Sequence, residues 1–227
     1  MARPRQFDER AVLTAVRDEF ASKGYTATSL DDLTRATGLG KGSIYAAFGD
    51  KRGLFLAALE LYANSTLEAT RAALSADRPA IERLRSLFDR PCPVRGRRSS
   101  YRGCFLANST TELAAIDAEV LTLARGIYRA VEELIIEVVR DAQRNGQLDR
   151  GLNASELGRL ILAIMQGEEF LEKAGMPMRD LEGIGRAARA LLFQDASTSP
   201  NGAAIEADFA QKRRRVIRGR RAQDIAR

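Results

Sequence analysis

Two carboxylate pairs, Glu132-Glu133 and Glu168-Glu169, are the groups of this chain that come nearest to a catalytic arrangement. The sequence contains no histidine, which removes the commonest general base together with Ser-His-Asp and Cys-His catalysis. Adjacent residues point about 100° apart on a helix, so neither carboxylate pair converges on one substrate. We therefore expect that the protein is not an enzyme.

Cys92 and Cys104 are the only cysteines. Two thiols without histidine are too few for a four-ligand zinc site, so we expect no metal and no cofactor. Cys104 opens a predicted helix just after a loop rich in arginine, and both features lower the pKa of a thiol. Two interpretations stay open: a thiolate that reacts with electrophiles or oxidants, with Cys92 as its partner, or an inert cysteine packed against the core.

The glycine-rich run Gly38-Leu-Gly-Lys-Gly-Ser43 is similar to a phosphate-binding loop. In that motif the lysine is followed by serine or threonine, whereas here Gly42 follows Lys41. Arg35 stands where the first glycine belongs, and no strand precedes the run. The sequence therefore does not predict a nucleotide site here.

Composition indicates a globular protein of 227 residues with 45% hydrophobic residues. No run approaches the roughly 18 apolar residues of a membrane span, and the N-terminus lacks the apolar core of a signal peptide, so we expect a cytoplasmic protein with no membrane partner. The net charge of +6 comes mostly from residues 201–227, which hold eight Lys and Arg against three Asp and Glu. This tail could be solvated, add a nonspecific DNA contact, or form a helix on an acidic surface.

The hydrophobic periodicity is helical nearly throughout, so the predicted class is all-α. Capping residues and glycines delimit nine helices, with a loop over residues 91–100 and a basic segment at the end. The predicted helices cover about residues 8–23, 29–37, 41–48, 51–76, 79–89, 103–115, 117–145, 153–174 and 180–193.

The second and third predicted helices are short, lie near the N-terminus and are joined by a glycine-containing turn, as in a helix-turn-helix. The run from Gly24 to Lys51 closely resembles the signature of the TetR/AcrR family of transcriptional regulators, over about residues 7–56. The resemblance implies that residues 41–48 form the recognition helix and that the DNA contacts come from Thr28, Lys41, Gly42, Ser43, Tyr45, Ala46 and Lys51.

The roles implied for these residues are physically reasonable. Gly42, Ser43 and Ala46 would face the bases, where a small face lets the backbone approach and lets alanine touch a thymine methyl. Tyr45 and Lys51 would reach phosphates, and Lys41 stands at a helix start that attracts the same group. Members of the family often carry larger side chains at positions 46 and 47, so we expect sparse readout and do not predict the operator sequence.

The resemblance also implies the organisation of the remaining chain. Residues 1–50 would form an N-terminal three-helix helix-turn-helix DNA-binding domain, residues 51–195 a C-terminal helical ligand-binding and dimerisation domain, and residues 196–227 a linker with the basic tail. The eighth and ninth helices would pair with their copies in a homodimer, with glycines such as Gly158 and Gly185 permitting close approach. The candidate ligand residues, each of which could equally be ordinary core, are Tyr62, Phe88, Cys104, Phe105, Asn108, Tyr128, Met165, Gln166 and Phe170.

The sequence thus predicts a sequence-specific transcriptional regulator, a repressor released from a palindromic operator in double-stranded DNA by a small-molecule or electrophile inducer. The context Gly-Cys-Phe-Leu around Cys104 resembles a branch of the family that includes regulators of electrophile and aldehyde detoxification. The alternative is a helical protein that binds nucleic acid nonspecifically through its tail, which predicts similar affinity for any duplex.

Overall fold

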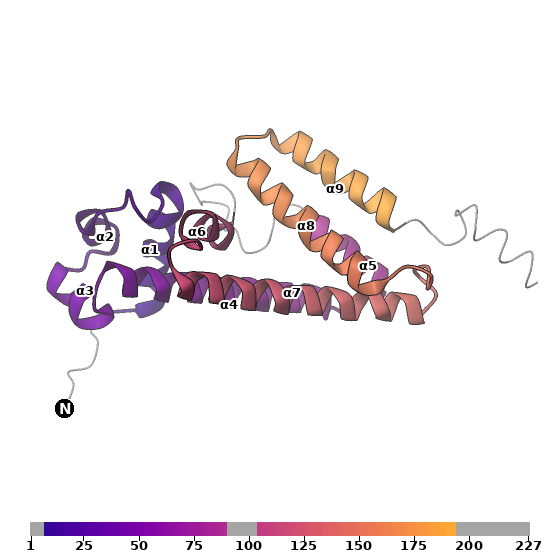
Figure 1. Ribbon diagram of the computed structural model, residues 1–227, viewed down its shortest axis with the longest axis horizontal. Coiled ribbons are helices and arrows are strands. Elements are labelled where there is room, and N and C mark those ends of the chain that lie inside the picture. Colours follow the sequence, from indigo (N-terminus) through magenta and orange to yellow (C-terminus); the bar gives the residue numbers. More distant parts are fainter. Residues whose placement is uncertain (1–6, 90–103, 194–227) are drawn as a thin grey trace, which may run out of the picture.

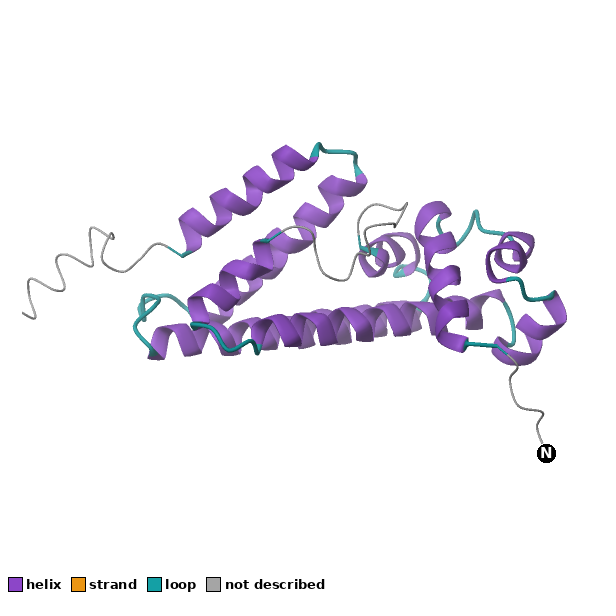
Figure 2. Ribbon diagram, turned by 180° about the vertical axis from the view of Figure 1, so that it is seen from behind, coloured by secondary structure: helices purple, strands orange, loops and turns teal. Residues whose placement is uncertain are grey.

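The computed structural model describes residues 7–89 and 104–193, which form nine α-helices, one 3₁₀ turn and no strand (Figure 1, Figure 2). The predicted all-α class is confirmed. Within these two ranges no helix has the length and apolar character needed to cross a membrane. The predicted loop with Cys92 and the basic tail fall outside the described residues.

The first three helices form a compact unit at one end of the molecule, with α1 at Glu9–Lys23, α2 at Leu30–Thr37 and α3 at Lys41–Phe48 (Figure 1). Ser29 caps α2 in a capping box, in which its side chain accepts from the backbone N–H of Asp32 and the Asp32 carboxylate accepts from that of Ser29. The side chains that hold the unit together are almost fully buried, and they are Val16, Phe20, Leu33 and Ile44.

Helix α4 (Lys51–Leu74) connects this unit to the rest of the molecule because it packs against both α1 and α7 (Ala118–Arg144). Its start is fixed by Asp50, whose carboxylate accepts a hydrogen bond from the backbone N–H of Gly53 at 2.7 Å. Figure 1 shows α4 and α7 running side by side along the length of the molecule. The described core residues form one continuous apolar cluster that includes α4, so both halves of the chain share a core.

The remaining helices are α5 (Ala80–Arg85), α6 (Phe105–Leu113), α8 (Ala154–Lys173) and α9 (Met178–Leu192), and the 3₁₀ turn η1 (Ser86–Phe88) follows α5. The fifth predicted helix is therefore α-helical only to Arg85, where a tighter turn brings Phe88 into the core against Phe193. The sixth is shorter than predicted. The ninth starts two residues earlier than predicted, because Pro177 supplies a backbone conformation that suits a helix start.

Gly53 lies in the first turn of α4, where a Cβ atom would come 2.0 Å from the carbonyl oxygen of Phe48. This approach is what allows α4 to follow directly on α3. We expect Gly53→Ala to lower the free energy of unfolding by about 1–3 kcal/mol, the usual cost of forcing a methyl group into a packed site. Urea unfolding followed by circular dichroism measures this difference.

Gly126 in α7 is the matched control, because a Cβ there meets nothing within 4 Å. Gly126→Ala removes only the flexibility of glycine in a helix, so it should raise the free energy of unfolding by about 0.5–1 kcal/mol. Equal effects of the two substitutions would contradict the close approach at Gly53.

Candidate nucleic-acid interface and its links to the second half

Helix α3 is anchored by one side and open on the other. Ile44 is fully buried, while its neighbour Tyr45 is 47% exposed. The other residues predicted to contact DNA from this helix, Lys41, Gly42, Ser43 and Ala46, are all exposed. The structure therefore places five of the seven predicted contacts on the solvent-exposed surface of a single short helix, at the outer end of the molecule (Figure 1).

The two predicted lysine contacts already have partners in the free protein. Lys41 Nζ lies 2.6 Å from a carboxylate oxygen of Asp31 on α2, and this hydrogen bond raises the pKa of the lysine. Lys51 Nζ lies 4.5 Å from the centre of the Tyr25 ring in a cation–π arrangement. A DNA phosphate near either lysine has to compete with these contacts, of which the exposed Lys41–Asp31 ion pair is weak.

Thr28 differs from the other six predicted contacts. Its side chain is 1% exposed, and its hydroxyl donates to the carbonyl oxygen of Gly24 at 2.6 Å. In this arrangement Thr28 stabilises the loop between α1 and α2. A contact from Thr28 to DNA stays a prediction.

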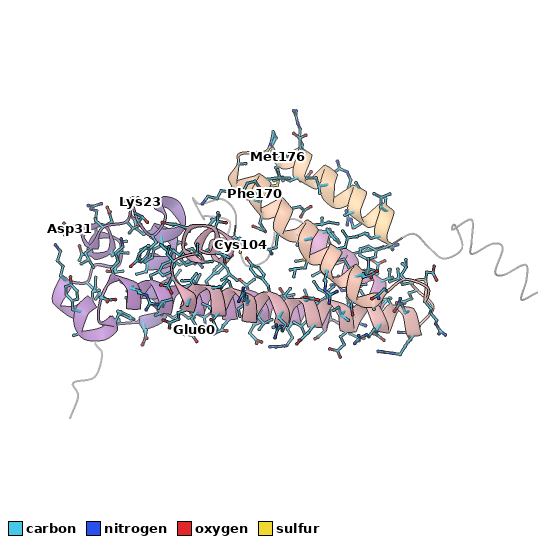
Figure 3. All side chains as sticks on the ribbon, in the orientation of Figure 1. Lys23, Asp31, Glu60, Cys104, Phe170 and Met176 are labelled. Carbon is cyan, nitrogen blue, oxygen red and sulfur yellow. The ribbon has the colours of Figure 1, made fainter. Side chains whose placement is uncertain are left out.

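The structure shows the surroundings of the nine predicted ligand residues, and their role in ligand binding stays a prediction. Three of them meet around the start of α6: the Tyr62 hydroxyl lies 3.6 Å from the sulfur of Cys104, and the Tyr62 and Phe105 rings pack edge to face at 5.7 Å. Tyr128 on α7 adjoins them, and its pKa is raised by burial and by the neighbouring Cys104. Cys104 itself is 8% exposed (Figure 3).

A second group faces the first three helices. Phe105, Asn108 and Phe170 line a cleft together with residues of the loop between α1 and α2. Phe170 is 68% exposed on the end of α8 (Figure 3). Phe105 belongs to both groups, so the cleft and the cluster around Cys104 share this ring.

The other three predicted ligand residues are Phe88, Met165 and Gln166. Phe88 packs against Phe193, with ring centres 6.0 Å apart. Met165 on α8 is partly buried against the core, and Gln166 beside it has a buried side-chain oxygen with no hydrogen-bond partner among the described residues.

The predicted dimer helices, α8 and α9, use part of their apolar surface inside the protomer. Leu157, Ile161 and Leu181 are buried, while Leu160 and Leu191 are 46% and 74% exposed. Two of the three glycines that the sequence suggested for dimer packing make close approaches within the chain, whereas a Cβ at the third, Gly183, would meet only the Arg186 side chain, at 3.8 Å. A Cβ at Gly158 would lie 2.5 Å from the Ile136 side chain, and one at Gly185 would lie 2.9 Å from the Phe88 carbonyl oxygen.

Sequence reasoning missed the polar links between the two halves. The Glu112 carboxylate on α6 accepts hydrogen bonds from the backbone N–H groups of Tyr25 and Thr26, at 2.9 and 2.8 Å. Gly24 has a φ of +83°, and a Cβ there would lie 2.9 Å from the same carboxylate. No sequence pattern predicts this contact, because its partners are more than 80 residues apart.

A second link lies at the start of α7. The Arg52 guanidinium donates to both carboxylate oxygens of Asp117, at 2.8 and 2.9 Å, and to Glu119 at 2.8 Å. Asp117 also caps α7, since its side chain accepts from the backbone N–H groups of Glu119 and Val120. The end of α6 is thus bonded to the loop after α1, and the start of α7 is bonded to the first turn of α4.

Comparison with known proteins identifies both halves of this arrangement. Residues 12–58 match the family model of bacterial regulatory proteins of the tetR family, and residues 80–191 match that of the tetracyclin repressor-like C-terminal domain. The HTH-type transcriptional repressor ComR of Escherichia coli is 27% identical over 183 residues, which are 80% of this chain and 87% of that protein. The transcriptional regulator AcuR of Cereibacter sphaeroides is 26% identical over 141 residues, which are 61% and 64% of the two chains.

Solved structures agree with these matches. A cysteine mutant of the TetR family transcriptional regulator CifR, complexed with 26bp double-strand operator DNA, has a TM-score of 0.67 and 27% identity, covering 83% of this chain and 98% of that one. The reduced form of Escherichia coli NemR has a TM-score of 0.72 at 16% identity, covering 82% and 96%, and supports the fold alone. These relatives are regulators and not enzymes. The chain belongs to the TetR family of DNA-binding transcriptional regulators.

Proposed function

We propose that this protein is a homodimeric repressor that reads a palindromic operator through α3 and leaves it when a small molecule or an electrophile reaches the second half. The observation that carries the proposal is the exposed face of α3. Small residues, Gly42, Ser43 and Ala46, allow that face to enter a major groove, and the buried Ile44 holds the helix in place. Tyr45, Lys41 and Lys51 would contact phosphates.

The dimer follows from the size of the reading surface. One eight-residue helix offers too few base contacts for a specific site, and a two-fold dimer doubles them on a palindrome. We assign the interface to α8 and α9, where Leu160 and Leu191 leave apolar surface exposed after the protomer core is formed. DNA-bound CifR supports operator binding by a chain of this fold.

The proposed domains are residues 1–50 for DNA binding and residues 51–195 for ligand binding and dimerisation, with residues 196–227 as a linker and basic tail. The Glu112 link crosses the boundary between the first two domains, whereas the Arg52 link joins the starts of α4 and α7 within the second domain. Because Glu112 lies in the last turn of α6 and Asp117 caps α7, a displacement of α6 by a bound ligand would be transmitted to the loop after α1 and to α4. Such a displacement changes the spacing of the two recognition helices in a dimer.

Selection of bound duplexes from a random DNA pool tests operator reading. The full chain and a chain that ends at Gln194 should both enrich one palindrome, since the reading surface lies in α3. If neither enriches a sequence and binding is lost with the tail, the nonspecific alternative holds and the repressor proposal fails.

Glu112→Ala tests the link between the halves. Removing two hydrogen bonds to a charged acceptor should lower the free energy of unfolding by about 1–3 kcal/mol and quicken amide hydrogen exchange at Tyr25 and Thr26. Glu137→Ala removes an exposed carboxylate from α7 and serves as the control. Unchanged exchange at both amides in Glu112→Ala would show that the carboxylate does not hold the loop.

Cys104→Ser tests the electrophile branch of the proposal. A thiolate adds to a quinone, so p-benzoquinone should release the wild-type protein from the selected operator and leave the variant bound. Cys92→Ser is the control and should still be released. If the Cys104→Ser variant leaves the operator at the same quinone concentration as the wild-type protein, the quinone acts on another group. Cys104 would then be a core residue beside Tyr62.

A further inference from the structure

A cleft of about 550 Å³ lies where the loop between α1 and α2, the helix α6 and the end of α8 meet. Figure 1 shows that the end of α8 is directed towards α6 and the first three helices. The volume falls in the range of small-molecule sites, about 300–1,000 Å³. The cleft borders the cluster around Cys104, because the Phe105 ring belongs to both.

The apolar part of the cleft is aromatic. Phe170 on α8 keeps 68% of its surface exposed although it lines a concave site, while Phe105 and Tyr25 contribute to the other walls. Tyr25 is fixed, because its ring packs against Phe20 at 5.8 Å and Phe55 at 4.9 Å. A flat aromatic ligand beside Phe170 would cover this exposed ring and gain an aromatic contact.

The charged residues of the cleft leave one positive group available. The Lys23 ammonium is held by Glu19 and Asp32, at 2.6 and 2.8 Å, and the Glu112 carboxylate is held by the two backbone N–H groups. Lys173, one turn after Phe170, is exposed and forms no ion pair with the residues that the structure describes. Lys23 is neutralised by its two carboxylates, so Lys173 is the group of the lining that can bind an anion.

We propose that this cleft is an effector site for small aromatic carboxylates, with the ring against Phe170 and the carboxylate on Lys173. The class of ligand follows from the spacing of Phe170 and Lys173, because positions three apart lie on the same side of a helix. A ring that carries its carboxylate directly can therefore reach both side chains.

The proposed effect on DNA binding rests on the proposed repressor function and acts through Glu112. Burial raises the pKa of this carboxyl, but the hydrogen bonds from Thr26 and Tyr25 and the charge of Lys173 hold it below its ordinary value. An anion bound to Lys173 offsets that favourable charge and brings a second carboxylate beside the first. The hold of Glu112 on the loop between α1 and α2 weakens, which loosens the first three helices from α6.

Calorimetric titration of the full chain with 2-naphthoate tests the site, with the neutral 2-naphthamide as the comparison ligand. Lys173→Met keeps the length of the side chain and removes its charge. It should weaken naphthoate binding about tenfold, because a hydrogen bond between charged groups contributes roughly that factor to the affinity. The neutral amide should bind the wild-type protein about tenfold more weakly than naphthoate for the same reason. Phe170→Ala should weaken both ligands. Arg179→Met removes a nearby exposed charge that does not line the cleft, and it should change the affinity less than twofold.

Hydrogen exchange of the same samples reports on the loop without any DNA. Saturating naphthoate should quicken exchange at the Tyr25 and Thr26 amides in the wild type and leave it unchanged in Lys173→Met. If Lys173→Met and Arg179→Met weaken naphthoate binding equally, the affinity depends on the overall charge of the protein and the proposal is wrong. The proposal is also wrong if naphthoate does not bind. Binding and faster exchange in a chain that enriches no operator would keep the effector site and contradict only the repressor function.

Discussion

The structure depends on a line of aromatic rings that runs from the first three helices into the second half. Phe20 of α1 packs edge to face on Phe55 of α4 at 5.1 Å, Phe55 packs on Phe105 of α6 at 5.9 Å, and Phe105 packs on Tyr62 at 5.7 Å. Phe20, Phe55 and Phe105 are each 1% exposed, so the line is an uninterrupted part of the core. This packing connects the DNA-binding unit to α4 and α6 through the core.

Hydrogen bonds and ion pairs near these rings, at the protein surface, set the orientation of the first three helices relative to α6 and α7. The Glu112 and Arg52 links lie where solvent reaches them, and each contributes far less than the buried rings between them. A ligand that binds one of two conformations about 5.5 kcal/mol more tightly than the other reverses the equilibrium between them. Polar contacts that contribute a few kcal/mol are therefore weak enough for ligand binding to break. An apolar core that fixes the connection and weak polar contacts that fix the angle are what the proposed control of DNA binding by a ligand requires.

Most helix boundaries were readable from the sequence, because the groups that end a helix are close in the chain. Asp50, Asp117 and Asn153 accept hydrogen bonds from the first turns of α4, α7 and α8, as their residue types and positions predict. The ligand residues were less readable. Helical periodicity shows that Phe88 and Tyr62 face inward, but it does not show that they face different parts of the interior.

The sequence by itself determined the all-α class and the short helices of the helix-turn-helix, because the periodicity, caps and glycines that define them lie fewer than thirty positions apart. The DNA-facing residues of α3 were implied by the family resemblance. Only the tertiary structure decided where α6 and α8 lie against the first three helices. That placement joins Glu112 to the loop after Gly24 and sets Phe170 and Lys173 beside the same loop. The reason is physical: the helices that meet there are distant in the chain, and the packing of large side chains, which no local pattern encodes, fixes their mutual positions.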